Sequence, residues 1–351
     1  MKREKRRMRL LGLLLCLTVV LGLLPGELPG AKAEIWVNTP DELKNALNDP
    51  DPLAPTIKLS TSINISQWTP VVTKEGTVLD LAGHTITISS DDGIAVGTDN
   101  EKNTIGSLTI TDSSSDQTGK IVADNNGSHT GITVYPKATV TLEKGTITGF
   151  GTGVVLLDKD ATFNMTGGTI ADCHCGVDQG TGTINISGSP IIKKKEEKNA
   201  IGIFIPIGKV INITGALTDK ANIGVTLGNT TGIFTKDFGI YNPGAEPSTF
   251  FKSDNDSGKI FLNNGEGKIN AAYVISVSFD DKKGSVTGNR TLEKGTTANL
   301  TAVPAGGYVF DNWTENESSV STANPYTLHS QQQPEPDGEL YQEELHCYGK
   351  Q

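Results

Sequence analysis

The sequence predicts an all-β protein: a right-handed parallel β-helix followed by a small β-rich module. The first observation is an internal repeat, in which residues 140–142 (VTL) return as residues 163–165 (FNM) and 184–186 (INI) at spacings of 23 and 21 residues. The second is that apolar residues alternate within each repeat, as they do in half-buried strands. The third is composition, because Gly is abundant at 40 residues, aromatic residues make up only 6% and long helical periods are absent. Many short strands joined by tight turns have this composition.

The repeat predicts three strands in every coil. One strand type reads apolar–x–apolar, a second follows a Gly, and a third has Gly before an apolar pair. Three strands per turn of about 22 residues predict a three-sided coil whose alternate apolar side chains point inward. We assign residues 63–65, 86–88, 108–110, 140–142, 163–165, 184–186 and 211–213 to the first type, 119–121, 145–147, 168–170 and 215–217 to the second, and 93–94, 131–132, 153–154, 176–177, 202–203 and 232–233 to the third.

Polar side chains recur between the apolar pairs of the first strand type. Asn64, Asn164, Asn185 and Asn212 share one position there, so we expect them to form an outward ladder of hydrogen bonds. Outward Thr residues are also repeated and could form a flat sugar- or ice-binding face. The β-propensity of Thr explains these arrays without any function, and we prefer that interpretation.

Residues 1–33 have the features of a secretory signal peptide. A basic start precedes an apolar stretch of 15 residues, and Ala31-Lys32-Ala33 forms a small–x–small cleavage site. A retained anchor is the alternative. Cleavage removes seven Lys/Arg and two Asp/Glu, which takes the net charge from −10 to about −15. So acidic a chain is a poor partner for nucleic acid or polyanionic sugars. We therefore expect a secreted or cell-surface protein with no membrane span after cleavage.

A short helix is predicted to cover the first coil. Thr39 is its N-cap, Pro40 its first residue, and Glu42 completes a capping box. Leu43, Ala46 and Leu47 form one apolar face. We expect this face to close the end of the β-helix core.

Residues 34–272 resemble the pectate-lyase-like right-handed β-helix superfamily. The resemblance lies in IWVNTPDELKNAL, TIKLSTSINIS, TVLDLAGHTITIS and the coils that follow. It implies the fold more strongly than a function, because the superfamily includes polysaccharide lyases, polygalacturonases and surface proteins without known catalysis.

Residues 273–327 resemble a divergent internalin-B-type repeat. The matching blocks are G-x-V-x-G at 284–288, KGTTANLTAVP at 294–304 and GGYVFDNW at 306–313, and Tyr308, Phe310 and Trp313 are expected to form a small core. The resemblance implies a module of bacterial surface proteins that serves as a stalk or contact surface.

Residues 328–351 do not continue this repeat. Codons exist for LHSQQQPEPDGELYQEELHCYGKQ that, shifted by one nucleotide, encode FTVNSNLNPTANFTKKNYTVTVN, which would complete the module. We therefore interpret the tail as the product of a frameshift that truncates the native C-terminus, and we expect it to be disordered. On this interpretation His329, His346 and Cys347 have no functional role.

The sequence gives only weak support for any catalytic residue. The resemblance implies that a pectate lyase would use an Arg base beside carboxylate-bound Ca²⁺, yet Arg occurs only in the predicted signal peptide and at Arg290. A Lys base stays open. Inverting glycoside hydrolysis needs two carboxyl groups roughly 6.5–9.5 Å apart. Asp91 and Asp92, with His129, are the candidates, and a solvated turn is the simpler interpretation of them.

Candidate metal ligands are also weak. Cys173, His174 and Cys175 combine two thiols and an imidazole, but a zinc site needs further ligands and we favour a structural role at a coil corner. A strained disulfide between the two cysteines is a lesser alternative. The carboxylates of Asp158, Asp160, Asp172 and Asp178 lie near corners of neighbouring coils and suit Ca²⁺, although they are out of register with the repeat. We expect no resident cofactor, with Ca²⁺ as the open alternative.

The function that follows is an exported bacterial cell-surface protein, adhesin-like or glycan-contacting, whose β-helix contacts a polysaccharide or a host or cell-surface glycoprotein without catalysis. A polysaccharide lyase or glycoside hydrolase acting along one face of the β-helix is the first alternative. A purely structural stalk is the second.

Overall fold

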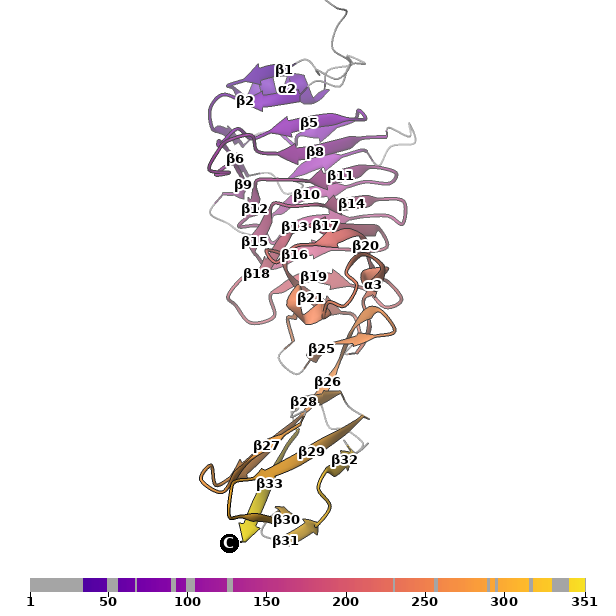
Figure 1. Ribbon diagram of the computed structural model, residues 1–351. Coiled ribbons are helices and arrows are strands. Elements are labelled where there is room, and N and C mark those ends of the chain that lie inside the picture. Colours follow the sequence, from indigo (N-terminus) through magenta and orange to yellow (C-terminus); the bar gives the residue numbers. More distant parts are fainter. Residues whose placement is uncertain are drawn as a thin grey trace, which may run out of the picture.

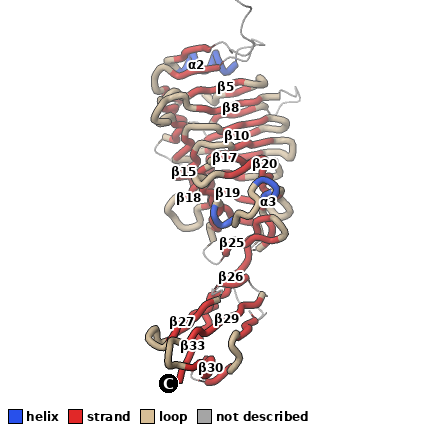
Figure 2. The backbone as a smooth tube through the Cα atoms, in the orientation of Figure 1, coloured by secondary structure: helices blue, strands red, loops and turns tan. Residues whose placement is uncertain are grey.

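The computed structural model describes most of the chain from Glu34 onward. The described residues are 34–48, 56–66, 68–89, 93–98, 105–124, 129–229, 231–255, 258–288, 291–293, 296–315, 318–329 and 341–350. They form a rod of stacked strands with a smaller module beyond its end (Figure 1). Figure 2 shows that helices are few and short. The all-β prediction is confirmed, and the predicted signal peptide lies outside the described residues.

One side of the rod is a parallel sheet that we call sheet A. Within the described residues it has nine strands, each contributed by a successive coil. Its strands are β1 (Glu34–Val37), β2 (Thr56–Leu59), β5 (Thr77–Asp80), β8 (Ser107–Thr111), β11 (Thr139–Leu142), β14 (Thr162–Met165), β17 (Thr183–Gly188), β20 (Ile211–Leu217) and β23 (Thr235–Lys236).

The other two sides are parallel ladders that β21 (Asn222–Leu227) joins into sheet B. The first ladder comprises β3 (Ile63–Ile65), β6 (Thr85–Ile88), β9 (Lys120–Ala123), β12 (Thr146–Thr148), β15 (Thr169–Cys173) and β18 (Ile191–Lys194). The second comprises β4 (Val71–Val72), β7 (Ile94–Val96), β10 (Thr130–Val134), β13 (Thr152–Leu156), β16 (Cys175–Asp178) and β19 (Ile201–Ile205). Three ladders confirm the three-sided coil.

The pairing confirms the repeat that the sequence shows and corrects parts of it. Val140 pairs with Phe163, and Phe163 with Ile184, as predicted. Residues 63–65 and 86–88 were assigned to the wrong side, because Ile86 pairs with Ile121 in sheet B. Both sides carry the same apolar–x–apolar pattern, so the pattern alone cannot separate them. Two later assignments were also wrong: residues 215–217 are the end of β20, and residues 232–233 form β22 (Gly232–Ile233), which pairs antiparallel with β26.

Glycines form a column along one inner corner of the coils. Gly131, Gly153, Gly176, Gly202 and Gly224 belong to successive coils. A Cβ on Gly153 would lie 2.5 Å from the carbonyl oxygen of Gly176 and 2.9 Å from Ile170 Cγ2. The corner can therefore be packed this tightly only without side chains at these positions.

Both ends of the core are covered. At the N-terminal end α2 (Pro40–Asn48) buries Leu43, Ala46 and Leu47, and the Glu42 amide donates to Thr39 Oγ1 at 3.2 Å, so the capping helix is confirmed (Figure 1). At the other end lie α3 (Phe238–Tyr241), the short 3₁₀ helix Pro247–Thr249 and β24 (Phe251–Ser253). Four aromatic side chains are buried there: Phe234, Phe238, Phe250 and Phe251.

One long strand links the rod to the module. β26 (Glu266–Phe279) pairs with β25 (Gly258–Asn263) beside the rod and with β28 (Thr291–Glu293) in the module. The domain boundary expected at residue 272 therefore falls inside a strand. The other strands of the module are β27 (Gly284–Thr287), β29 (Thr297–Pro304), β30 (Val309–Glu315), β31 (Ser318–Ser321), β32 (Tyr326–His329) and β33 (Tyr341–Lys350).

Trp313 is the centre of the module. It is fully buried, packs against Phe310 and Tyr326, and donates from Nε1 to the Ala323 carbonyl at 2.9 Å. The prediction of Phe310 and Trp313 in this core is confirmed. Tyr308 was also predicted there, but the tyrosine that packs against the core is Tyr326.

The tail differs from the disordered segment that we expect from the sequence. β33 pairs parallel with β26 and antiparallel with β30. The backbone groups along β26 and β30 need partners, and the backbone of almost any extended segment supplies them. Residues 330–340 lie outside the described part of the chain.

Candidate functional site

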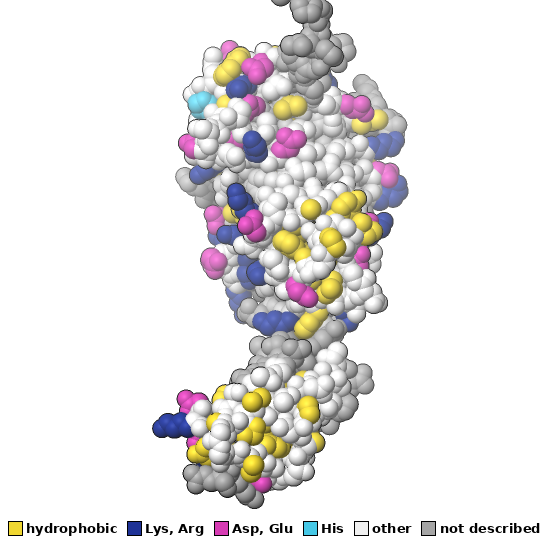
Figure 3. Space-filling view, in the orientation of Figure 1, with side chains coloured by type: hydrophobic (Ala, Val, Ile, Leu, Met, Phe, Trp, Pro, Cys, Tyr) yellow, Lys and Arg dark blue, Asp and Glu magenta, His cyan; other side chains and the backbone are white. Residues whose placement is uncertain are grey.

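The outward side chains of sheet A from β8 to β20 form a flat, uncharged surface that we call the A face. It consists of two rows in register, with Ser107, Thr139, Thr162 and Thr183 in the first and Thr109, Thr141, Asn164, Asn185 and Asn212 in the second. Their neighbours along each strand point inward and are buried, because side chains alternate along a strand. All nine side chains are partly exposed and end in a hydroxyl or an amide. Figure 3 shows a broad area without charged side chains over β8 and β11.

A ladder of hydrogen bonds fixes the second row. Asn212 Nδ2 donates to Asn185 Oδ1 at 2.9 Å, and Asn185 Nδ2 donates to Asn164 Oδ1 at 2.9 Å. Asn164 Nδ2 then donates to Thr141 Oγ1 at 3.2 Å. The expected ladder therefore forms, except that Asn64 lies on β3 of sheet B and Thr141 stands at the end of the ladder. Aligned bonds of this kind polarise one another and hold the side chains in one orientation.

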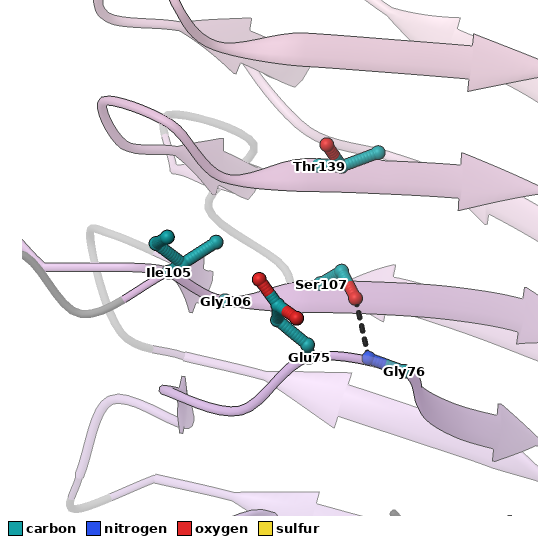
Figure 4. A pocket seen from close by; sticks show the side chains of 6 residues that line it. All are labelled: Glu75, Gly76, Ile105, Gly106, Ser107 and Thr139. Atoms are coloured by element: carbon teal, nitrogen blue, oxygen red, sulfur yellow. Dashed lines mark hydrogen bonds between the residues drawn. The ribbon is translucent and has the colours of Figure 1, made fainter.

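A shallow groove lies beside the first row. Its volume is about 520 Å³, and it is lined by Glu75, Gly76, Ile105, Gly106, Ser107 and Thr139. Figure 4 shows the Glu75 carboxylate pointing into the space between Ile105 and Ser107, with Thr139 on the next strand. The Gly76 amide donates to Ser107 Oγ, which fixes the hydroxyl oxygen and leaves its proton available to a ligand. The groove thus combines a carboxylate, two hydroxyls and an aliphatic side chain.

The N-terminal margin of sheet A carries a charged row. Lys58 Nζ lies 5.0 Å from the ring centroid of Trp36 and 3.4 Å from Asp80 Oδ2. Trp36 is 56% exposed, so its ring presents a large aromatic surface at this margin. The next residue in this row is Thr111 on β8, which pairs with Asp80 and carries no charge.

Two buried carboxylates join neighbouring coils at the carboxyl-terminal ends of β5 and β8. Asp112 accepts hydrogen bonds from the amides of Gly83, Ser114 and Gly119 and from the Ser114 hydroxyl. Burial alone would raise the pKa of Asp112, but the hydrogen bonds from Ser114, Gly119 and Gly83 outweigh burial and lower it.

Asp80 is held in a similar way. Its Oδ1 accepts from the amides of Ala82 and Ser113. The pKa of Asp80 is also lowered, because hydrogen bonds from Ser113 and Ala82 and the charge of Lys58 outweigh the opposing effect of burial. Both carboxylates join neighbouring coils and have little capacity left for a ligand.

The candidate catalytic residues are placed only in part. Asp91 and Asp92 lie outside the described residues. His129 stands immediately before β10, with Nε2 3.7 Å from Asp124 Oδ1, and its side chain is 12% exposed. The proposed trio therefore stays a prediction.

In the Cys173-His174-Cys175 segment the two cysteine side chains are buried and the histidine side chain is exposed. Both thiols are free and buried, and burial raises their pKa values to about 11 for Cys173 and about 12 for Cys175. The His174 imidazole lies on the surface, where Nδ1 is 2.9 Å from Glu197 Oε1. The three side chains do not converge on one point.

The carboxylates proposed for Ca²⁺ are engaged in local contacts. Asp158 Oδ1 accepts from the Asp160 amide, and Asp178 Oδ1 accepts from the Gly180 amide, both at 3.0 Å. Asp160 pairs with Lys159 at 2.6 Å. Among the described residues no group of three His, Cys, Asp or Glu side chains could hold a metal ion.

The groove was missed by sequence reasoning. Glu75 and Ile105 lie outside the strand pattern, in connections between strands, and the register that brings them beside Ser107 appears only in the folded chain. The signal that was present is the interruption of the repeat that ends at Ile105, directly before the strand that carries Ser107.

The fold and the A face define a class of protein, an all-β parallel β-helix with a small β-rich module. A family model described as a divergent InlB B-repeat domain matches residues 274–333. No curated protein and no solved structure matches the chain. The match confirms the internalin-B-type resemblance of the module and indicates a bacterial surface repeat protein. Among the described helices, none has the length and apolarity that a membrane crossing requires.

Proposed function

We propose that this protein is exported to the bacterial cell surface, where the A face of its β-helix contacts glycan without catalysing a reaction on it. The observation that carries the proposal is the pair of uncharged rows, the second of which is fixed by the Asn164–Asn185–Asn212 ladder. Hydroxyl and amide groups pair well with the hydroxyls of sugars, which both donate and accept hydrogen bonds.

Preorganisation supports the same proposal. A side chain that is already ordered loses little conformational entropy on binding, whereas a mobile one loses about 0.5–1.5 kcal/mol. The ladder fixes its amides, and β-branching restricts Thr139 and Thr162. The face therefore suits a ligand that makes many weak, repeated contacts.

The surface location is supported by the module, since divergent InlB B-repeats are typical of bacterial surface proteins. β26 runs from the rod into the module, and a continuous strand would hold the β-helix away from the point of attachment. The signal peptide, an adhesive role and the identity of the glycan are part of this proposal.

The experiment is a binding screen of the chain from residue 34 onward against immobilised polysaccharides and glycoproteins. The proposal expects retention of the protein by at least one glycan, with no release of reducing ends or unsaturated uronates on long incubation. Product release would favour the enzyme alternative. Absence of binding across the panel would favour the structural stalk.

A further inference from the structure

We propose that the groove of Glu75, Ile105, Ser107 and Thr139 is a subsite for one ring of a neutral polysaccharide. This inference rests on the proposed function and names the class of ligand. The bound polymer would continue from the groove along the first row toward Thr162 and Thr183, because Ser107 and Thr139 belong to both surfaces.

Glu75 is the polar group best suited to recognise a sugar. The carboxylates of Asp80 and Asp112, at the other ends of β5 and β8, are buried and accept hydrogen bonds from backbone amides. Glu75 is exposed, and the described residues give its carboxylate no hydrogen-bond or ion-pair partner. An ionised carboxylate can accept from two adjacent hydroxyls at once, and such charge-assisted bonds are about twice as strong as neutral ones.

The remaining groups complete an amphipathic site. Ser107 and Thr139 supply hydroxyls on neighbouring strands, and Ile105 supplies an aliphatic wall that is 45% exposed. A pyranose ring has polar hydroxyls around its edge and C–H groups on its faces. The groove offers a partner for each: Figure 4 shows Ile105 on one side, the hydroxyls of Ser107 and Thr139 on the other, and the Glu75 carboxylate between them.

Charge selects against acidic sugars. None of the described residues that line the groove is Lys, Arg or His, and Glu75 is the one charged side chain among them. A uronate or sulfate would therefore meet the like charge of Glu75. A neutral sugar with adjacent hydroxyls has no such penalty.

The test measures dissociation constants of the chain from residue 34 onward for soluble neutral glucan, mannan and galactan, with polygalacturonate as the acidic comparison. Glu75→Gln removes the charge and keeps the shape. A charge-assisted bond is worth about 1.5–3 kcal/mol, so we expect Glu75→Gln to weaken binding of the preferred neutral polymer about tenfold or more. The matched control is Glu143→Gln, which changes an exposed carboxylate at the end of β11 outside the groove and should leave binding within about twofold.

Ile105→Ser provides a second variant, which retains every polar group and should also weaken binding. Neutral-polymer binding that Glu75→Gln and Ile105→Ser leave unchanged would overturn this inference while the proposed function stands. Tighter binding of polygalacturonate than of every neutral polymer would do the same. Failure of the unsubstituted chain to bind any glycan would overturn both.

Discussion

Asn185 donates from Nδ2 to Oδ1 of Asn164 at 2.9 Å, across two strands that are 21 residues apart in the chain. The same geometry recurs between Asn212 and Asn185, so one amide joins three coils. Asn164 and Asn185 each use one N–H and one carbonyl lone pair in the ladder, and Asn212 uses one N–H, so the second N–H of each amide remains available at the surface. The ladder therefore serves both the stability of the rod and the chemistry of the A face.

Substitution of the central amide should lower stability. Asn185→Ala leaves Asn212 without its acceptor and Asn164 without its donor. Because a net hydrogen bond contributes about 0.5–1.5 kcal/mol, we expect a loss of about 1–2 kcal/mol in the free energy of unfolding, measured by urea denaturation. Thr183→Val on the same strand is the control and should cost less, because it keeps the β-branched shape. Equal losses for the two variants would contradict a role for the ladder.

Asp112 should make the β-helix sensitive to acid. Its folded pKa is lowered, so its contribution is present above the unfolded pKa of about 3.9 and is lost as the pH falls through the folded pKa. At pH 7, Asp112→Asn should cost about 1–3 kcal/mol, because the new amide NH₂ would face a backbone N–H donor such as that of Gly119. Urea midpoints at pH 7 and pH 3 should differ less in the variant than in the unsubstituted protein. A parallel pH dependence in both proteins would refute this role.

Asp254 should have the opposite pH dependence. Burial raises its pKa, and hydrogen bonds from the Gly202 amide and Thr226 hydroxyl offset burial only in part. A raised folded pKa stabilises the fold below the unfolded value, and this contribution is lost as the pH rises through the folded pKa. Asp254→Asn can still accept both hydrogen bonds through one oxygen, so its stability relative to the unsubstituted protein should improve from pH 3 to pH 7. Urea denaturation at both pH values measures this difference, and a decline with rising pH would show that the ionised form is needed.

The glycine column should not accept a methyl group. A Cβ on Gly153 would lie within 2.9 Å of both Gly176 O and Ile170 Cγ2, and overpacking of this kind typically costs about 1–3 kcal/mol. We expect Gly153→Ala to lower the urea midpoint of the β-helix. Gly306→Ala, whose Cβ meets nothing within 4 Å, is the control and should leave the midpoint near its original value. If Gly153→Ala is as stable as the control, the corner is more open than the packing indicates.

The coils could be predicted because each strand must bury its alternate apolar side chains in the same core. Val140, Phe163 and Ile184 occupy equivalent inward positions, and this spacing alone gave their pairing. The two ladders of sheet B could not be separated from sheet A in the same way, since Ile86 and Val140 have the same apolar–x–apolar surroundings. The ladder of Asn164, Asn185 and Asn212 followed from its position in the repeat.

The groove and the structural carboxylates depend on residues outside the repeat. Glu75 and Ser107 are brought together by a register that an insertion obscures, and Asp112 looks like any turn residue until its four donors are in place. The pairing of the C-terminal strand β33 could not be predicted from the sequence either. β33 finds its place through backbone groups, which carry no sequence signal.

Calorimetry combined with product analysis shows whether the A face binds glycan and leaves it chemically unchanged. The chain from residue 34 onward is titrated calorimetrically with the glycan that retains it best, and the same mixture is then analysed for cleavage products. We expect saturable binding that Asn185→Ala and Thr139→Ala both weaken, with the glycan recovered intact. Binding that neither variant changes, or recovery of shortened or unsaturated chains, would contradict it.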